Sequence, residues 1–381
     1  MRVVADENMP AVEQLLGDRA QVRRLPGRQI TRADVAGADA LLVRSVTPVN
    51  AALLAGTDIR FVGTATAGTD HVDVSWLRQA GITFADAAGA NANSVVEYVL
   101  CAIAETDDFL ERLLAGAVVG IVGFGHVGSL LASRLEGLGI RFRAHDPWLA
   151  PGSVANACSL AEALACDVIC LHPALTDAAP WPSRHLLAGK RVAALHASQL
   201  LINASRGEVV DNHALLARLQ APAAPQTVLD VWEHEPRIMA PLLEHVRFGS
   251  AHIAGYSYDS KLLATQRLVQ AMECCGLLSG ASVSGLADEP RQWRLDSAAS
   301  TADAIRQLLA SAYTVSADDQ QLRAVTLNVA PAQAAGQFDE LRKHYPLRRE
   351  LAGSHVVLTT ATAAYSEVVT ALGCHCETEV R

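Results

Sequence analysis

Short apolar runs alternate with amphipathic stretches along most of the chain. Over residues 1–93 the apolar runs are RVVA, ALLV, IRFV and ITFA, and each is followed by a loop rich in Ser, Thr, Asp or Gly. Such alternation is typical of β–α–β units that build a parallel sheet. The pattern therefore predicts an α/β fold.

The same pattern restarts after residue 117. Six apolar runs precede residue 250, and they read AVVGIV, RFRAH, DVICL, LLINA, TVLDV and VRFG. Six strands are enough for one complete doubly wound sheet. Helical spacing over residues 94–114 predicts one long helix, and the stretch YSYDSKLLATQRLVQAMECCGLL predicts another that returns to the first domain.

The composition shifts towards Gly, Ser and Pro over residues 279–290, which indicates a linker. The pattern beyond it predicts a small α/β module. We expect helices near 299–313, 334–344 and 361–372, strands at 322–329 and 355–358, and a last short strand.

Composition and charge narrow the class of partner. Half of the 381 residues are hydrophobic, and the net charge of −9 argues against binding to nucleic acid. The first residues turn acidic at Asp6, unlike a signal peptide. The most apolar long stretch carries Lys190, Arg191 and His196, so we expect no contact with a membrane. These features favour a cytoplasmic protein.

The eight cysteines are scattered and form no pair of CxxC motifs. A zinc site is therefore not expected, nor are disulfides in a reducing compartment. Cys374 and Cys376 flank His375 and offer a possible metal site, but a short strand is the simpler interpretation, so we expect no metal.

A glycine-rich motif lies between two of the apolar runs. Gly123 permits a tight turn, Gly125 lets the backbone approach a pyrophosphate, and Gly128 lets the following helix pack closely on the strand. Asp146 stands eighteen residues after Gly128, where a carboxylate accepts both ribose hydroxyls and repels a 2′-phosphate. The motif predicts NAD as cofactor. A glycine turn without a ligand leaves Asp146 unexplained.

Three ionisable residues follow successive strands of the same half: Arg206, Glu235 and His252. Side chains at the carboxyl ends of parallel strands converge on one crevice. Transfer of a hydride from a 2-hydroxy acid needs a base for the hydroxyl proton, a carboxylate that stabilises the imidazolium, and a guanidinium that binds the substrate carboxylate. Each residue also has a purely structural interpretation, but three at successive strand ends favour one site.

The stretches LLINASRGEVVDNHALL, LDVWEHEP and SAHIAGYS resemble the three late motifs of the D-isomer-specific 2-hydroxyacid dehydrogenases. That family places its catalytic Arg, Glu and His where these three residues stand. The resemblance implies a flavodoxin-like substrate domain formed by residues 1–93 with about 257–280. It also implies a Rossmann-type NAD-binding domain formed by residues 94–256.

Four further stretches of the chain resemble one branch of this family in particular. They are VADENMP, LLVRSVTPVN, FVGTATAGTDHVD and FDELRKHYPLRRE. The similarity implies oxidation of 4-phospho-D-erythronate, and a homodimer paired through a C-terminal dimerisation domain at 281–381. It assigns substrate contacts to Ser45, Thr66 and Tyr256. The residues that it assigns to NAD are Gly123, Gly125, His126, Val127, Gly128, Asp146, Ala204, Ser205, Asp230 and Gly255.

Arg44 is a separate candidate for the substrate phosphate, with an ordinary solvated arginine as an equal alternative. We expect Arg348 and Arg349 to be solvated charges, with a contact to a neighbouring subunit's site as the alternative. Pro173 stands where the family usually has a hydroxyl or Val before Pro, so no NAD contact is assigned there. Two alternative functions remain at this point: another member of the family, such as 3-phosphoglycerate dehydrogenase, and an NAD-sensing protein without turnover.

Overall fold

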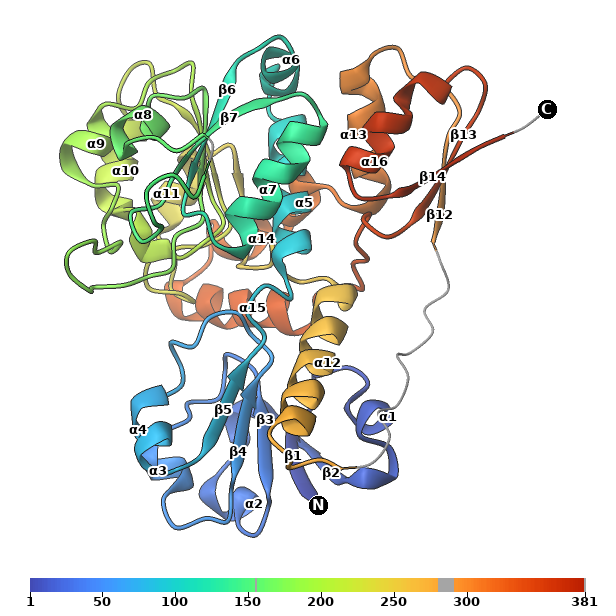
Figure 1. The fold of residues 1–381 in the computed structure, drawn as a ribbon. Helices are drawn as coiled ribbons and strands as arrows, with labels where there is room; N and C mark the ends of the chain where they lie inside the picture. Colours follow the sequence, from blue (N-terminus) through green and yellow to red (C-terminus); the bar gives the residue numbers. More distant parts are fainter. Residues whose placement is uncertain (155, 280–290, 380–381) are drawn as a thin grey trace. The chain divides into compact units, whose positions relative to one another are not determined.

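The computed structural model describes residues 1–154, 156–279 and 291–379, so the predicted linker lies almost wholly outside the described residues. The chain divides into two compact units, Met1–Asn91 with Ser257–Glu289 and Ala92–Tyr256 with Pro290–Arg381. Each unit is built from helices and parallel strands, which confirms the α/β class (Figure 1). The boundaries of the three expected domains stay a prediction.

The first unit contains a five-stranded parallel sheet with the order β2-β1-β3-β4-β5. Its strands are β1 Arg2–Asp6, β2 Gln21–Leu25, β3 Ala40–Val43, β4 Phe61–Thr64 and β5 Thr83–Asp86. This is the flavodoxin-like order. The sequence pattern missed β2 because this edge strand reads QVRRL and is largely exposed.

Side chains of this sheet alternate between two apolar clusters. Val3 and Leu42 pack on one face with α1 (Val12–Leu16) and α12 (Tyr258–Cys274). Val4 and Leu41 pack on the other with the remaining helices, which are α2 Arg32–Val35, α3 Ala51–Leu54 and α4 Val74–Gln79. Both faces are therefore covered, which is why the central strands read as continuous apolar runs. The predicted helix that returns to this unit is confirmed as α12.

The second unit contains a six-stranded parallel sheet with the order β11-β10-β9-β8-β6-β7. All six predicted strands are present, as β6 Val118–Val122, β7 Arg141–His145, β8 Val168–Leu171, β9 Leu200–Asn203, β10 Gln226–Leu229 and β11 Phe248–Gly249. The chain runs from β6 to β7 on one side and then to β8 on the other. In doubly wound sheets the ligand crevice lies at this reversal of strand order.

Helices cover both faces of this second sheet. One face carries α5 Ala92–Glu105, α6 Phe109–Leu114 and α7 His126–Gly137, and the other carries α8 Leu160–Leu164, α9 Gly189–Ala193, α10 Asn212–Leu219 and α11 Ala240–His245. The single helix expected over 94–114 is wrong. Thr106 bonds its hydroxyl to the carbonyl oxygen of Ala102 at 2.6 Å, and Asp107 adopts φ 41°, so the helix ends and restarts.

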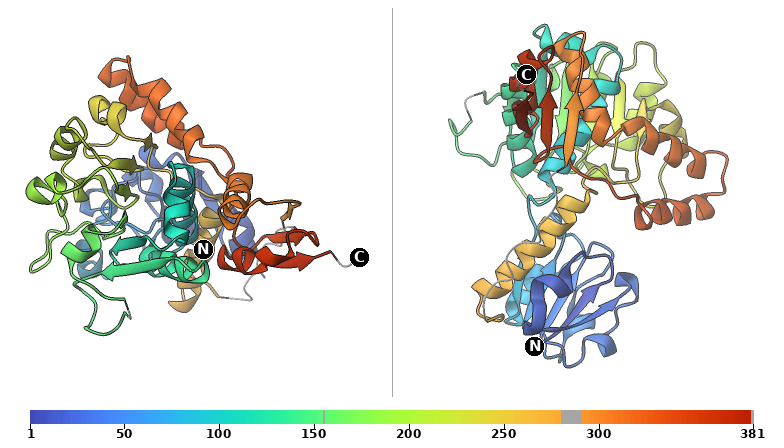
Figure 2. Two further views of the ribbon diagram at one scale, coloured as in Figure 1. Left: turned by 90° about the horizontal axis from the view of Figure 1, so that it is seen from above. Right: turned by 90° about the vertical axis from the view of Figure 1, so that its right-hand side faces the viewer.

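The C-terminal residues add a three-stranded parallel sheet with the order β12-β13-β14, seen from two further sides in Figure 2. Its strands are β12 Gln292–Leu295, β13 His355–Leu358 and β14 His375–Thr378, and the helices of this segment are α13 Thr301–Ala312, α14 Val315–Thr326, α15 Pro331–Lys343 and α16 Ser366–Ala371.

The strand expected at 322–329 is wrong, because these residues mostly belong to α14. Buried Val315, Asp319, Leu322 and Thr326 follow helical spacing along it. Asp319 accepts a hydrogen bond from the backbone N–H of Gly249 at 2.8 Å, so α14 covers the edge strand β11. The β-branched residues at the end of the helix suggested a strand.

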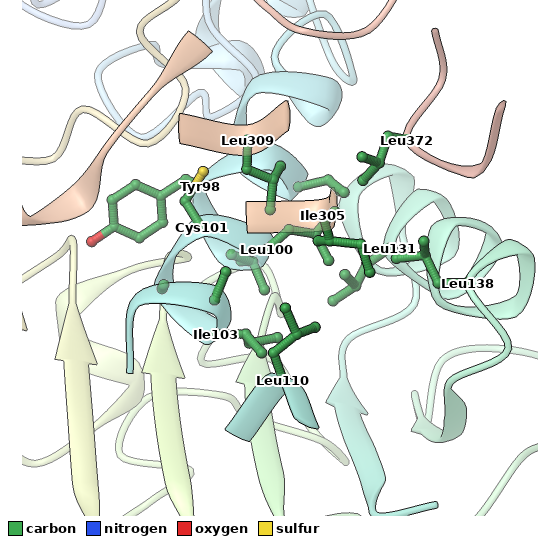
Figure 3. Packing of buried hydrophobic residues seen from close by; sticks show 14 of the residues in the cluster. Tyr98, Leu100, Cys101, Ile103, Leu110, Leu131, Leu138, Ile305, Leu309 and Leu372 are labelled. Atoms are coloured by element: carbon green, nitrogen blue, oxygen red, sulfur yellow. The ribbon is translucent and has the colours of Figure 1, made fainter. Parts of the chain in front are cut away.

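The C-terminal segment shares a hydrophobic core with the six-stranded sheet. Ile305 and Leu309 of α13 pack against Leu100 of α5 and Leu131 of α7, and Leu372 joins the same cluster (Figure 3). All five side chains are buried. The segment is therefore part of the second unit.

Arg348 strengthens this connection and corrects the expectation of a solvated charge. Its side chain is buried and donates to the carbonyl oxygens of Ser94 at 2.9 Å and Ala254 at 3.1 Å. The guanidinium carbon lies 3.9 Å from the ring centroid of Tyr313. A buried cation requires such partners. Arg348 thus ties the C-terminal segment to α5 and to the loop after β11.

Close packing of α8 on β6 predicts a marked effect of one methyl group. A Cβ at Gly120 would lie 2.1 Å from the carbonyl oxygen of Ala163, so Gly120→Ala should lower the free energy of unfolding by about 2 kcal/mol. Gly336 in α15 is a matched control with no such neighbour, and Gly336→Ala should raise that free energy by about 1 kcal/mol. Urea unfolding of both variants measures the difference. Unchanged stability of Gly120→Ala would contradict this packing.

Candidate active site

The loops that carry the predicted trio leave the same edge of the six-stranded sheet. Arg206 follows β9, Glu235 follows β10 and His252 follows β11, and these three strands are parallel neighbours. The glycine loop follows β6, two strands away from β9. The strand order therefore gathers the predicted cofactor loop and the predicted catalytic loops at one edge.

The imidazole of His252 and the carboxylate of Glu235 are in contact. His252 Nδ1 lies 2.7 Å from Glu235 Oε2, and the backbone N–H of Trp232 donates to Glu235 Oε1 at 2.9 Å. This contact assigns the Nδ1 proton to the hydrogen bond with Glu235 and leaves Nε2 of the neutral ring as an acceptor. About a third of the His252 side chain is exposed, so the ring has room to exchange a proton with a ligand.

Glu235 has a lowered pKa despite its burial. Burial raises the pKa of this carboxyl, but the charge and hydrogen bond of His252, the charge of Arg342 and the N–H of Trp232 together bring it below its ordinary value. Glu235 is therefore a carboxylate at neutral pH, and a carboxylate beside the ring stabilises the imidazolium form.

Asp230 fixes the backbone on which His252 stands. Its Oδ1 accepts from the hydroxyl of Ser250 at 2.7 Å and the N–H of Ile253 at 2.8 Å, and its Oδ2 accepts from the N–H of Ala254 at 3.0 Å. The N–H of His252 donates to the carbonyl oxygen of Asp230 at 2.7 Å. These bonds hold His252 at φ 56°, in the left-handed region. A contact of Asp230 with NAD stays a prediction.

Arg206 lies in a loop clamped by Asn203. The side-chain amide of Asn203 donates to the carbonyl oxygen of Arg206 at 3.0 Å and accepts from the hydroxyl of Ser205 at 2.8 Å. Arg206 Nη1 donates to the carbonyl oxygen of Ser205 at 2.8 Å. A Cβ at Gly207 would lie 2.0 Å from the Trp232 backbone. The Arg206 loop therefore packs directly on the loop that leads to Glu235.

The glycine motif forms a tight loop with open space at its middle. Gly123 has φ 91°, and a Cβ there would lie 2.5 Å from the backbone nitrogen of Pro173. A Cβ at Gly128 would lie 2.1 Å from the carbonyl oxygen of Gly123, so the first turn of α7 packs tightly on the loop. Apart from its chain neighbours, no atom of the described residues lies within 4 Å of a Cβ built on Gly125, which directly precedes α7. This is the position where a helix N-terminus receives a phosphate.

Asp146 lies beside that loop. Its Oδ2 accepts from the N–H of Phe124 at 2.9 Å, and its Oδ1 accepts from the N–H of Trp148 at 3.0 Å. A carboxylate oxygen accepts two hydrogen bonds, so each oxygen keeps capacity for a ribose hydroxyl. The other predicted NAD residues lie in the loops already described: His126 and Val127 begin α7, Ala204 and Ser205 precede Arg206, and Gly255 follows the His252 loop.

Tyr256 has a partner that sequence reasoning missed. Arg342 of α15 donates from Nη2 to the hydroxyl oxygen of Tyr256 at 3.0 Å. The Tyr256 ring meets Tyr345 edge to face, with centroids 6.0 Å apart. Arg342 and Tyr345 belong to the FDELRKHY stretch, which served only as a mark of similarity in the sequence.

The remaining predicted residues belong to the first unit. Arg44 and Ser45 follow β3 and Thr66 follows β4, so they share the carboxyl edge of the five-stranded sheet. Burial and the nearby charge of Arg44 lower the pKa of Lys261 in α12 to about 8. Lys261 was missed because only the fold brings it near Arg44. Two adjacent cations are typical of an anion site.

Two family models match parts of this chain. The family model described as the NAD binding domain of D-isomer specific 2-hydroxyacid dehydrogenases matches residues 93–254, and a model for a domain of unknown function matches residues 288–373. The chain is 44% identical to the erythronate-4-phosphate dehydrogenase of Cellvibrio japonicus (strain Ueda107), over 99% of this chain and 100% of that protein. It is 42% identical to that of Pseudomonas syringae pv. syringae (strain B728a), over 98% and 99% respectively.

Solved structures share the fold. The NAD⁺-bound 3-phosphoglycerate dehydrogenase of Entamoeba histolytica aligns with a TM-score of 0.62 at 19% identity, over 76% of this chain and 99% of that chain. A D-lactate dehydrogenase from Aquifex aeolicus, complexed with NAD and lactic acid, aligns at 0.59 and 21% identity, over 72% and 95%. Among the described helices, none is long and apolar enough to cross a bilayer.

Proposed function

Because this chain belongs to the erythronate-4-phosphate dehydrogenases, within the D-isomer specific 2-hydroxyacid dehydrogenase family, we propose that it oxidises 4-phospho-D-erythronate with NAD. The product is 3-hydroxy-2-oxo-4-phosphooxybutanoate, and the reaction belongs to pyridoxal 5′-phosphate biosynthesis. The observation that carries the proposal is the 2.7 Å contact between His252 and Glu235 at the same edge of the sheet as the glycine loop.

The residues around the glycine loop fit NAD. The open space beside Gly125 receives the pyrophosphate at the N-terminus of α7, and the Asp146 carboxylate receives the ribose hydroxyls. Asp146 would repel a 2′-phosphate, which favours NAD over NADP. When bound, NAD supplies the acceptor for the hydride that leaves carbon 2 of the substrate.

His252 acts as the general base. Its Nε2 takes the proton of the substrate hydroxyl, because Nδ1 is bonded to Glu235. Glu235 holds the ring in this orientation and stabilises the imidazolium that forms. Arg206 binds the substrate carboxylate and polarises the developing carbonyl oxygen.

Arg44 and Lys261 bind the substrate phosphate. A phosphate dianion relieves the repulsion between the two cations, which is the physical support for this assignment. Ser45 and Thr66 leave the same sheet edge as Arg44 and are assigned to the substrate. Tyr256 is assigned to it as well.

The protein works in the cytoplasm as a homodimer paired through its C-terminal segment. The similarity to the erythronate-4-phosphate dehydrogenase branch is the support for this assignment. Leu347 lies in that segment and exposes 74% of its surface, so it is a position that a subunit interface would bury.

The first test is turnover of purified protein with 4-phosphoerythronate and NAD, followed by absorbance of NADH in the presence of a 2-oxo-acid trap. We expect 4-phosphoerythronate to be oxidised faster than 3-phosphoglycerate. His252→Ala should lower kcat by about a thousandfold and leave NAD binding intact, because it removes only the base. Faster turnover of 3-phosphoglycerate would refute the substrate assignment, and full activity of His252→Ala would refute the mechanism.

The phosphate site predicts a selective loss of substrate affinity. Arg44→Ala should raise KM for 4-phosphoerythronate about thirtyfold, which corresponds to about 2 kcal/mol for a hydrogen bond to a charged group, and leave KM for NAD unchanged. In the parent, kcat/KM should fall above pH 8 as Lys261 loses its proton, and Lys261→Met should abolish this decline. Equal effects of Arg44→Ala on both KM values would contradict the assignment.

The homodimer predicts a sensitive position in the C-terminal segment. Leu347→Asp should raise the dimer dissociation constant by about tenfold or more, because a buried interface charge without a partner is costly. Sedimentation velocity measures the dissociation constant, with Leu263→Asp in the first unit as the control. A parent protein that sediments as a monomer at micromolar concentration would refute the dimer.

A further inference from the structure

Arg342 brings a charge from the C-terminal segment to the candidate active site. It stands near the end of α15, and its Nη2 donates to the hydroxyl oxygen of Tyr256 at 3.0 Å. Its guanidinium carbon lies 5.6 Å from the centroid of the same ring. Tyr256 follows the loop that carries His252, so α15 reaches this loop through one side chain.

The hydrogen bond fixes the chemical character of Tyr256. A guanidinium only donates, so the phenolic oxygen is the acceptor and its own proton is directed away from Arg342. A phenol held this way donates readily to a carboxylate or phosphate oxygen. Arg342 thereby prepares Tyr256 as a donor to an anion.

Arg342 also acts on Glu235 by its charge. Burial raises the pKa of Glu235, and the hydrogen bond with His252 and the charge of Arg342 are among the interactions that lower it. The groups that face Arg342 itself are Tyr256, Glu235 and Asp339. One guanidinium is therefore coupled to both the phenol and the carboxylate of the site.

The bonding of Arg342 differs from that of a purely structural arginine nearby. Arg323 in α14 uses all three of its side-chain nitrogens, which bond to Asp319 and to the carbonyl oxygens of Leu243 and Val246. Among the described residues, Nε of Arg342 is buried and has no hydrogen-bond partner. Arg348 also leaves Nε unbonded, but both of its terminal nitrogens bind backbone carbonyls. A buried donor without a partner is costly, so the fold alone does not explain Arg342.

We propose that Arg342 is a positioning residue of the dehydrogenase, which orients Tyr256 as a hydrogen-bond donor to the substrate and places a positive charge beside the pair of Glu235 and His252. This inference rests on the proposed function. It gives the C-terminal segment a role in the reaction in addition to pairing subunits.

The test compares Arg342→Met, Arg342→Lys and a matched control, Lys343→Met, which changes the exposed neighbour. Arg342→Met should raise KM for 4-phosphoerythronate about tenfold at unchanged KM for NAD, because Tyr256 loses its orientation. The acid limb of its kcat/KM profile should move up by about one pH unit, because the hydrogen-bonded pair of Glu235 and His252 loses a neighbouring positive charge and binds a proton more readily.

Arg342→Lys should restore the acid limb and leave KM high, because lysine supplies the charge without the planar fork. Lys343→Met should match the parent in both. A KM and pH profile of Arg342→Met that equal those of Lys343→Met would overturn the inference. If Arg342→Met does not fold, Arg342→Lys with Tyr256→Phe forms a double-mutant cycle, and strictly additive effects on KM would overturn it.

A measurement without substrate separates this inference from the proposed function. The Glu235 carboxyl is titrated by ¹³C NMR in the parent and in Arg342→Met, or in Arg342→Gln if the first variant is unstable. An upward shift of the Glu235 pKa supports the coupling, and an unchanged titration refutes it, whatever substrate the parent oxidises. Failure of the parent to turn over 4-phosphoerythronate refutes only the proposed function.

Discussion

A buried carboxylate at the end of β10 determines how the rest of the site is arranged. Asp230 is almost fully buried, and such a charge is stable only when its oxygens are hydrogen-bonded. The donors are Ser250, Ile253 and Ala254, so the backbone after β11 is fixed against the end of β10 by hydrogen bonds. His252 belongs to this fixed segment. Its partner Glu235 lies on the loop that begins at Asp230, and one strand end therefore sets the position of both members of the pair.

The C-terminal segment extends this arrangement from the other side of the loop. Arg348 binds the carbonyl oxygen of Ala254, the same residue whose N–H is held by Asp230. The backbone beside His252 is thus fixed at its N–H by an anion and at its carbonyl by a cation. Ser94 of α5 also donates to the Ala254 carbonyl, at 2.8 Å, so elements distant in sequence stabilise one peptide group. The position of the His252 loop therefore depends on Ser94 and Arg348, which lie far from this loop in the sequence.

Local patterns were enough to predict all six strands of the second unit's larger sheet, because buried parallel strands read as apolar runs. They also place Arg206, Glu235 and His252 after β9, β10 and β11, while the catalytic roles of the three stay a prediction. Prediction from apolar runs failed for elements whose apolar pattern does not reflect their burial or their secondary structure. Strand β2 is polar and exposed, and α14 ends in β-branched residues although its buried positions have helical spacing. The partners Lys261, Arg342 and Arg348 were missed for a different reason. Their roles depend on tertiary distances that no local spacing encodes, so an ordinary arginine or lysine in the sequence carries no signal.

The side chain of Arg348 lies between α5 and the His252 loop, and this position has an evolutionary consequence. A terminal domain attached only by a tether can be gained or lost by gene fusion without damage to its neighbour. Here a deletion would remove the Arg348 donor from two carbonyl oxygens and would expose the apolar side of α5. In relatives without this segment we therefore expect different residues in α5 and in the loop after β11, where Arg348 binds.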